Sequence, residues 1–487
     1  MKDYNNVIIG LEIHCQLTAL KSKLFCTCST DYRDKAPNTL LCPVCLGLPG
    51  SLPVLNQRVI ELAVMVALAL KSQISEKSFF FRKNYYYPDM PKNFQISQYD
   101  KSGGIPLAVG GSVNSRFEGK EREVEIIRVQ VEEDPAKLVY VGSIDCSPYT
   151  LVDYNRAGIA LLEIVTKPTI KSPGEARILL QKLRSIFEHL GVSDGSLAGA
   201  MRCDANISIA GGERVEVKNI SSFKEVERAL NFEITRQRNL LVRGREITME
   251  TRHWDEVKRV TVSLRSKEEE HDYRYFPEPD LVPVILSDEY INRIRLFLPE
   301  LPDARRDRLM KEYDLSQYDA EVITSEKDLA DFFEQCIARG GDPKQVGNWI
   351  MTDFLRWLRE EELDLAATRV TPQNLVEMIR LIEEGTISGK IGKSVLRTMM
   401  KTGKSAQEIV KTEGLVRIAS EREIRSLVDK IVKEHVKAVE DASVDEKAIH
   451  FLVGQLMKLS GGKADPPLAN KVLREKLEEL KRESKKS

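Results

Sequence analysis

Residues 7–17 read VIIGLEIHCQL, and this run decides how the first part of the chain folds. Apolar residues occupy alternate positions, which predicts a β-strand with one buried face. The opposite face carries Glu12, His14 and Gln16. Carboxylate and imidazole groups in register are typical of sites that hold a divalent metal or transfer protons. A single strand of this kind is, however, more often a plain half-exposed strand.

The same alternation recurs in three other segments. Their sequences are MRCDANISI, EIIRVQVEED and RVEVKN, and their polar positions include Arg202, Asp204, Arg128, Gln130, Glu132, Glu216 and Lys218. In the second segment we expect Ile127, Val129 and Val131 to face the core. If these strands share one sheet, its apolar face forms the core and its other face carries metal- and phosphate-binding groups. Several such strands together favour an active-site floor over an ordinary solvated face.

Length and composition bound the class of protein. A chain of 487 residues with 42% hydrophobic residues is expected to form two to four domains. Lys and Arg number 73 against 74 Asp and Glu, so any contact with nucleic acid must be local. No apolar segment has the length of a membrane span, and the start MKDYNNVIIG lacks the pattern of a signal peptide. We therefore expect a cytoplasmic protein without a membrane partner.

The pattern changes along the chain. Up to about residue 290, strands with alternating apolar and polar residues are interspersed with helices, which favours an antiparallel α+β domain. One helix is capped by Asn56, and another runs from Ser172 to Gly191. Beyond it, segments such as VGNWIMTDFLRWLREEEL have helical spacing and predict a helical bundle. We expect three domains, at residues 1–292, 293–405 and 406–487.

A cysteine cluster follows the first strand. The segment FCTCSTDYRDKAPNTLLCPVCLGLPG carries Cys26, Cys28, Cys42 and Cys45 as a CxC pair and a CxxC pair. Two short-spaced thiol pairs separated by a loop are typical of a tetrahedral zinc site. Four thiolates leave no open coordination position, so this zinc should stiffen a loop rather than perform chemistry. The alternatives are reduced bystander cysteines or a redox pair.

Three acids stand in succession in VEEDPAK, namely Glu132, Glu133 and Asp134. Their mutual repulsion is tolerable if a cation lies among them, although an isolated EED is also compatible with an exposed acidic turn. Glu12 and His14 are candidate partners. Mixed oxygen and imidazole ligation suits magnesium or manganese.

The segment RKNYYYPDMPKNFQISQ mixes cations, aromatics and amides between Arg82 and Gln98. Such a loop can stack a base or clamp phosphate, but it can equally pack on its own tyrosines. LVDYNRAGIALLEIV adds Asn155, Arg156 and Glu163 in one turn-and-strand unit. The sequence contains neither of the common glycine-rich phosphate motifs, so a metal and arginines on the sheet would have to hold the phosphates of a nucleotide.

Taken together and in this order, the motifs resemble the B subunits of the tRNA-dependent amidotransferases, the GatB family. The motifs are IGLEIHCQL, CPVCLGLPGSLPVLN, RKNYYYPDMPKNFQISQ, VEEDPAK, DYNRAGIALLEIV, MRCDANISI, VEVKNISSF, ETRHWDE and DYRYFPEPDLVP. FLVGQLMKLSGGKADPPLANKVL resembles the helical tail of the same family, so the resemblance spans nearly the whole chain. The related archaeal GatE family has a large inserted domain, for which this chain is too short.

The resemblance implies a fold and a reaction. It implies a cradle domain with an antiparallel sheet distantly similar to glutamine synthetase, then a helical domain, then a YqeY-like helical tail that contacts tRNA. The implied enzyme is an ATP-dependent carbon–nitrogen ligase that uses Mg²⁺ and carries Zn²⁺. It phosphorylates the side-chain carboxylate of misacylated Glu-tRNA(Gln) or Asp-tRNA(Asn), and ammonia then converts the product to the amide. The implied partners are the amidase of the complex (its A subunit), a small third protein (its C subunit) and the misacylated tRNA, but not DNA.

The resemblance also implies roles for residues. Glu12, His14 and Glu133 would form the metal and catalytic centre, with Glu132 and Asp134 in support. From strand facing we expect ATP-phosphate or metal contacts at Arg202, Asp204, Glu216 and Lys218, and we add Arg82 and Lys83 as cofactor-binding residues. The four clustered cysteines match the zinc positions of the family. Two rival functions are a noncatalytic tRNA-docking scaffold and a free-standing carboxylate–amine ligase.

Overall fold

The computed structural model describes residues 6–99, 101, 103–141, 147–194, 199–220, 222–265, 273–416, 420–442, 446–461 and 463–484. The chain forms two compact units, residues 1–305 and 306–487. The first unit mixes strands and helices, and the second is helical. This confirms the expectation of a mostly antiparallel mixed domain followed by helical domains. Among the described helices, none combines the length and the apolar character needed to cross a bilayer.

The first unit is built on a large, mostly antiparallel sheet. Its strands follow the order β15-β14-β13-β12-β1-β11-β8-β5-β4-β16, and the pair β13–β14 is parallel. These strands are β1 (Val7–Gln16), β4 (Phe80–Asn84), β5 (Phe94–Gln98), β8 (Lys120–Glu133), β11 (Ala160–Thr166), β12 (Met201–Ile209), β13 (Val215–Ile220), β14 (Glu250–Asp255), β15 (Val260–Arg265) and β16 (Phe276–Pro277). The remaining strands are β2 (Gln73–Ile74), β3 (Lys77–Ser78), β6 (Ala108–Val109), β7 (Ser112–Phe117), β9 (Lys137–Tyr140), β10 (Thr150–Asp153) and β17 (Val284–Ile285).

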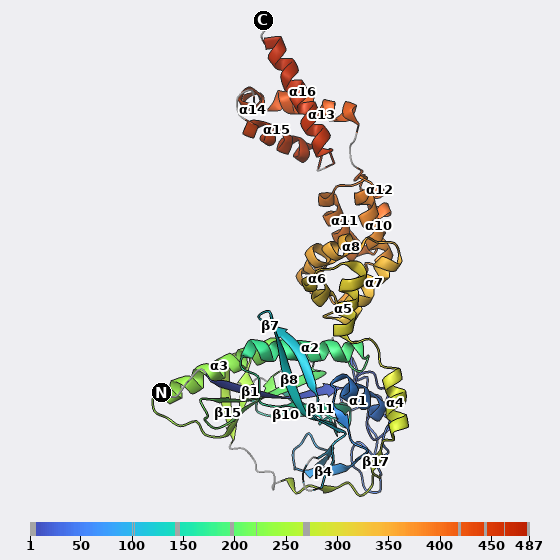
Figure 1. The fold of residues 1–487 in the computed structure, drawn as a ribbon, viewed down its shortest axis with the longest axis vertical. Helices are drawn as coiled ribbons and strands as arrows, with labels where there is room; N and C mark the ends of the chain where they lie inside the picture. The colour runs from blue at the N-terminus through green and yellow to red at the C-terminus, as the bar shows by residue number, and fades with distance from the viewer. Residues whose placement is uncertain are drawn as a thin grey trace. The chain divides into compact units, whose positions relative to one another are not determined.

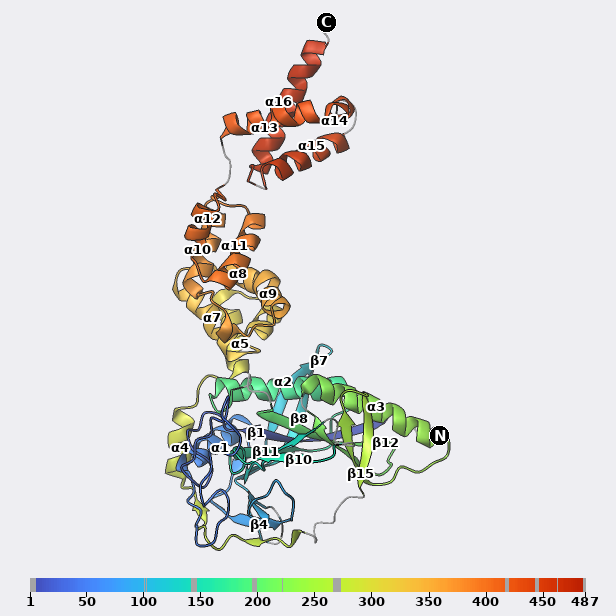
Figure 2. The same ribbon diagram turned by 180° about the vertical axis from the view of Figure 1, so that it is seen from behind.

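Two long helices cover one face of this sheet (Figure 1). They are α2 (Pro173–His189) and α3 (Phe223–Val242), and Figure 2 shows α3 lying along β12 and β15. On β1, Leu11, Ile13 and Cys15 are buried in the core beneath them, as the alternation predicts. The unit also contains α1 (Gln57–Ala69) and α4 (Asp288–Leu296), which pack together. The polar side chains of β1 therefore lie on the face away from α2 and α3.

The predicted helix ends are confirmed. The Asn56 side chain accepts a hydrogen bond from the Arg58 N–H at the start of α1. Ser172 caps α2 in the same way, with Pro173 in the first turn. Gly191 follows α2 with φ +64°, a left-handed conformation that glycine adopts without a steric penalty.

One facing prediction for β8 is wrong. Ile127 is 37% exposed, and Ile126 is buried in its place. The pairing of β8 with β11 jumps from Arg128 to Ile126, so Ile127 is the extra residue of a β-bulge. The bulge reverses the alternation on its N-terminal side only, and Val129 and Val131 face the core as expected.

The second unit contains two separate hydrophobic cores. The helices of the first are α5 (Pro302–Tyr313), α6 (Gln317–Ile323), α7 (Lys327–Ala338), α8 (Pro343–Trp349), α9 (Leu355–Glu360), α10 (Pro372–Glu383), α11 (Gly389–Thr402) and α12 (Ala406–Thr412). The helices of the second are α13 (Glu421–Glu434), α14 (Val436–Asp441), α15 (Glu446–Leu459) and α16 (Pro466–Ser484). A π-helical turn (Ile350–Phe354) joins α8 to α9, and a 3₁₀ turn spans Leu365–Ala367.

Side-chain packing continues a few residues beyond 292 and 405, where the sequence predicts domain boundaries. Leu298 and Leu301 still pack against the core of the first unit. Helix α12 contributes Ala406, Ile409 and Val410 to the core of α5–α11 rather than to that of the tail. The predicted helical side of residues 346–363 is present, since Ile350, Phe354 and Leu358 are buried and Trp349 packs half-buried against the same core.

Candidate active site

Strand pairing around β1 assembles the polar face of the sheet. Glu12 lies opposite Asp204 of β12, and His14 lies between Arg202 of β12 and Glu163 of β11. Residues directly opposite on antiparallel strands have Cβ atoms about 5 Å apart, so side chains on the same face meet. Strands that are distant in the sequence therefore bring their polar residues together on one floor.

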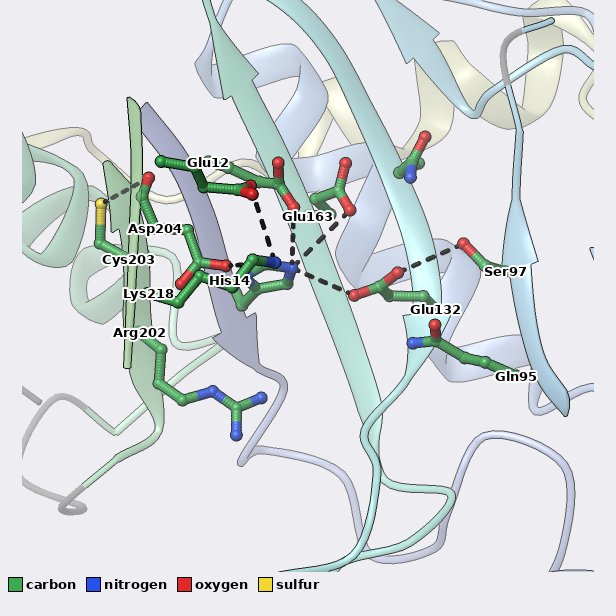
Figure 3. Close-up of polar contacts among 12 residues, drawn as sticks. Glu12, His14, Gln95, Ser97, Glu132, Glu163, Arg202, Cys203, Asp204 and Lys218 are labelled. Atoms are coloured by element: carbon green, nitrogen blue, oxygen red, sulfur yellow. Dashed lines mark hydrogen bonds and ion pairs between the residues drawn. The ribbon is translucent and has the colours of Figure 1, made fainter. Parts of the chain in front are cut away.

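His14 lies at the centre of three carboxylates (Figure 3). Its Nε2 atom lies 3.3 Å from Glu132 Oε1. The same atom lies 3.6 Å from Glu12 Oε1 and 3.7 Å from Glu163 Oε2. The Glu132 and Glu163 side chains are almost fully buried, whereas that of Glu12 is 27% exposed. These four residues are named the acidic cluster below.

Burial and mutual repulsion set the protonation of the acidic cluster. Burial and the neighbouring Glu163 carboxylate raise the pKa of Glu12 to about 7. Against the effect of burial, the hydrogen bond from His14 lowers the pKa of Glu163 to about 2. Burial by itself would lower the pKa of His14, but hydrogen bonds to Glu132 and Glu163 raise it well above its usual value. A protonated His14 therefore offsets part of the negative charge of the cluster.

The donor set of the acidic cluster suits a small divalent cation. The ligand atoms of Glu12, His14 and Glu163 all lie within 4.8 Å of one another. Carboxylate oxygens are the ligands that Mg²⁺ prefers, and an added imidazole also suits Mn²⁺. Glu132 lies beside the same imidazole. The residues present thus fit a metal-dependent centre.

Glu133, which the resemblance assigns to the metal and catalytic centre, lies apart from the acidic cluster. Successive residues of a strand point to opposite faces, and Glu133 follows Val131 towards the buried side. Its carboxylate forms a buried ion pair with Lys92. It also accepts a hydrogen bond from the Ile96 N–H at 3.0 Å. Both oxygens of the Glu133 carboxylate therefore already accept hydrogen bonds.

Asp134 is also held apart from the acidic cluster by other partners. Arg202 Nη2 donates to Asp134 Oδ1 at 2.7 Å, and Gln16 Nε2 donates to Asp134 Oδ2 at 2.6 Å. Arg156 Nε lies 3.6 Å from the same carboxylate, whose side chain is fully buried. Asp134 therefore fixes the guanidinium of Arg202, a residue that pairs with His14 in the sheet.

Asp204, Glu216 and Lys218 form a second charged group on the floor, next to Glu12. Lys218 Nζ lies 3.2 Å from Asp204 Oδ2 and 3.6 Å from Glu216 Oε1. Thr251 Oγ1 donates to Glu216 Oε2 at 3.1 Å. Burial opposes the charge of Lys218, but the carboxylates around it raise its pKa. Figure 3 shows Lys218 and Asp204 beside the acidic cluster.

The two predicted cations of β4 point to different faces. Arg82 donates to Glu278 from Nε at 2.7 Å and from Nη2 at 2.8 Å, and its Nη2 lies 3.0 Å from Asp280. Two nitrogens of this guanidinium thus donate to acids. Lys83 lies opposite Gln95 and is close enough to Glu163 to lower the pKa of that carboxyl. Of the two residues, Lys83 belongs to the polar floor.

The four predicted zinc ligands come together in the segment between β1 and α1. The Sγ atoms of Cys26, Cys28, Cys42 and Cys45 all lie within 4.8 Å of one another. The Cys42 N–H donates to Cys45 Sγ at 3.1 Å. The hydrogen bond from the Cys26 thiol, with smaller contributions that include the Lys23 ammonium, lowers the pKa of Cys45 to about 5. Four converging sulfurs of which one ionises readily fit a structural zinc.

The Asn155 turn fastens the cysteine loop to the sheet. Asn155 Oδ1 accepts hydrogen bonds from the Thr39 and Leu40 N–H groups, each at 2.8 Å. Its Nδ2 donates to the Ala36 carbonyl at 2.8 Å. Arg156, the next residue, donates to the carbonyls of Pro135 and Ala136 directly after the EED acids. This turn therefore links the cysteine loop to the end of β8.

Sequence reasoning assigned no role to Glu163, which the structure places among the acidic residues around His14. The sequence could have indicated this position, because Glu163 is the only charged residue in the largely apolar strand ALLEIVT. Arg128 was expected only on a polar side, and its Nη2 lies 3.2 Å from Glu163 Oε1. Nothing in the sequence around Lys92 distinguishes this partner of Glu133 from a surface lysine.

Two family models match the chain. The model described as the GatB/GatE catalytic domain matches residues 7–292, and a model described as a GatB domain matches residues 331–477. Curated relatives named as B subunits of aspartyl/glutamyl-tRNA(Asn/Gln) amidotransferase are similar over almost their whole length. The relative from Sulfolobus acidocaldarius is 49% identical over 472 residues, which cover 97% of this chain and 99% of the relative. The relative from Carboxydothermus hydrogenoformans is 46% identical over 488 residues, covering 99% of this chain and all of the relative.

Proposed function

The chain belongs to the GatB/GatE family, and on this basis we propose that it is a subunit of a tRNA-dependent amidotransferase. In this complex it would activate the side-chain carboxylate of the amino acid on a misacylated tRNA. The substrates would be Glu-tRNA(Gln), Asp-tRNA(Asn) or both. The observation that carries the proposal is the acidic cluster, in which three carboxylates surround one imidazole on the floor of the sheet.

The proposed reaction has two steps. The side-chain carboxylate attacks the γ-phosphorus of ATP, which gives an acyl phosphate and ADP. Ammonia then attacks the acyl carbon, and inorganic phosphate leaves as the amide forms. Phosphorylation is needed because a carboxylate would otherwise have to expel an oxide, whereas phosphate is a far better leaving group.

The acidic cluster would hold Mg²⁺ through Glu12, His14 and Glu163, with Glu132 beside them. A bound magnesium ion would neutralise charge on the ATP phosphates. Arg202 would contact a phosphate, because it pairs with His14 across the sheet and Asp134 fixes its guanidinium. Lys218 would serve the same purpose from β13, where Asp204 and Glu216 orient its ammonium.

The cysteine cluster would carry a structural zinc. Its four sulfurs leave no position for a substrate, so the ion would stiffen the loop between β1 and α1. The Asn155 turn joins this loop to the strand end that carries Glu132. We therefore propose that zinc contributes stability and not chemistry.

The proposed reaction needs partners. The described cysteines are four zinc-type ligands and three buried thiols, which offers no nucleophile for releasing ammonia from glutamine. The amidase of the complex would supply the ammonia, and its small third protein would complete the assembly. The C-terminal helices α13–α16 would contact the tRNA, and the complex would work in the cytoplasm, where tRNA is charged.

The two rival functions have weaker support. A scaffold that only docks tRNA would gain nothing from buried carboxylates, because they repel phosphate. A free-standing ligase would need its own ammonia source and would have no use for the helical tail. Neither rival accounts for the acidic cluster and the full-length similarity to amidotransferase B subunits together.

The test is amide formation by the complex reconstituted with the amidase and the small third protein. Wild-type complex, ATP, Mg²⁺ and glutamine are incubated with Glu-tRNA(Gln) and, separately, with Asp-tRNA(Asn). We expect amidation of at least one of them, and a loss of about 100-fold in Glu12→Ala. Glu125→Ala, which removes an exposed acid of β8, is the matched control and should retain activity. Full activity of Glu12→Ala would refute the assignment, and inactivity on both tRNAs would refute the function.

A further inference from the structure

Lys23 is a fully buried cation. Its relative exposure is 0%, and it is among the largest side chains that the fold encloses completely. A lysine ammonium removed from water is strongly unfavourable unless an anion lies nearby. The Lys23 ammonium therefore requires a negative charge in its surroundings.

The expected carboxylate partner is missing from the described part of the chain. Lys23 Nζ donates to the Leu40 carbonyl at 3.0 Å, and no described Asp or Glu forms an ion pair with it. Glu133 Oε1 lies 3.6 Å from the position that a Cβ on Gly158 would occupy, and Lys23 Cδ lies 3.7 Å from the same position. However, Lys92 and the Ile96 N–H already engage the Glu133 carboxylate. A carbonyl oxygen satisfies one N–H of the ammonium and carries no net charge.

Lys23 is connected to both halves of the cysteine loop. Its backbone N–H donates to the Cys28 carbonyl at 3.0 Å, which links it to the CxC pair. Its side chain reaches Leu40, two residues before Cys42, which links it to the CxxC pair. Lys23 Cδ and Cys45 Cβ each lie 3.7 Å from one point, the position that a Cβ on Gly158 would occupy. The ammonium stem and the cysteine cluster thus share one neighbourhood.

The charges are complementary. Four thiolates around Zn²⁺ carry a net charge of about −2, which a partly buried loop must offset. Resting on the zinc site proposed above, we propose that the Lys23 ammonium is the counter-charge of the zinc tetrathiolate formed by Cys26, Cys28, Cys42 and Cys45. Lys23 is then a positioning residue, because it stabilises the thiolates without binding the metal.

The experiment compares the purified full-length wild-type protein with Lys23→Met and Lys23→Arg. Lys21→Met is the matched control, since Lys21 is exposed and two residues away. Lys92→Met tests whether any buried lysine near Glu133 has the same effect. Zinc content, zinc affinity by competition with a chelator, the Co²⁺ absorption spectrum and the melting temperature with and without zinc are measured.

We expect zinc affinity to fall 10- to 100-fold in Lys23→Met, the range typical for groups that support metal ligands. Co²⁺ should still give the spectrum of four thiolates. The increase in melting temperature that zinc provides should be smaller in Lys23→Met than in wild type, while Lys21→Met and Lys92→Met keep wild-type affinity and Lys23→Arg retains part of it. If Lys23→Met does not fold, Lys23→Gln takes its place.

Two results would overturn the inference and one would overturn its premise. Equal zinc affinity in wild type and Lys23→Met would show that the ammonium does not serve the thiolates. An equal drop in melting temperature with and without zinc would assign Lys23 a packing role only. Wild-type protein that binds no zinc would instead refute the proposed zinc site itself.

Discussion

Glu132 and Glu133 are adjacent in the sequence, yet their carboxylates lie on opposite faces of the sheet. Glu132 lies 3.3 Å from the His14 imidazole, whereas Glu133 is paired with Lys92 on the buried side. The pleat of β8 thus gives one acid to the polar floor and the other to the interior.

This separation predicts different effects for the same substitution at the two positions. Glu132→Gln should increase the Mg²⁺ concentration needed for half-maximal amidation and leave stability nearly unchanged. Glu133→Gln should leave Lys92 buried and unpaired, which costs about 3 kcal/mol of unfolding free energy, with an unaltered Mg²⁺ requirement. Urea unfolding and Mg²⁺ titration of activity measure the two quantities. An effect of Glu133→Gln on the Mg²⁺ requirement alone would contradict this division.

Glu163→Gln should impair metal binding, a role that the sequence analysis did not assign to this residue. The substitution keeps the shape of the side chain and removes a charge 3.7 Å from His14 Nε2. We expect at least a tenfold increase in the Mg²⁺ concentration required for activity. Glu125→Gln, which changes an exposed acid on β8, is the control. If the two variants respond equally to Mg²⁺, Glu163 is not a ligand.

Mg²⁺ binding should release protons. The pKa of His14 stands well above its usual value because, despite burial, Glu132 and Glu163 hydrogen-bond to the imidazole. A metal must displace this proton, so Mg²⁺ affinity should increase with pH through the neutral range and level off above the raised pKa. Titration calorimetry in two buffers of different ionisation enthalpy counts the released protons. An affinity independent of pH would argue against His14 as a ligand.

The alternation of apolar and polar residues was sufficient to predict the floor of the site. It placed Glu12, His14, Glu132 and Lys218 on the polar face, where the structure has them. This works because strand periodicity is a local property that the burial of one face enforces.

The sequence pattern predicted neither the order of the strands in the sheet nor the bulge in β8. Nothing local indicates that β11 lies between β1 and β8, which is what brings Glu163 beside His14. The bulge at Ile127 has no local sequence signal. The facing of Glu133 does follow from the alternation, since Glu133 shares its side of β8 with Val129 and Val131. The three adjacent acids suggested one site, whereas the pleat of β8 places Glu132 and Glu133 on opposite faces of the sheet.

Removing zinc should weaken the fold of the first unit. Chelation should lower the melting temperature because the four cysteines would lose the ion that closes their loop. Cys42→Ser should lower the melting temperature in the same direction, and stability should fall more than the intrinsic rate of amidation. Differential scanning calorimetry before and after chelation is the measurement. An unchanged melting temperature without zinc would contradict a structural role for the ion.

We propose that the acidic cluster around His14 holds the catalytic cation. Electron paramagnetic resonance of Mn²⁺ bound in place of Mg²⁺ reports on this site, because a coordinated imidazole gives a nitrogen hyperfine coupling. We expect this coupling in the wild-type protein and in Glu125→Gln, and its loss in His14→Gln. Mn²⁺ bound with the same affinity but without nitrogen coupling in the wild-type protein would contradict it.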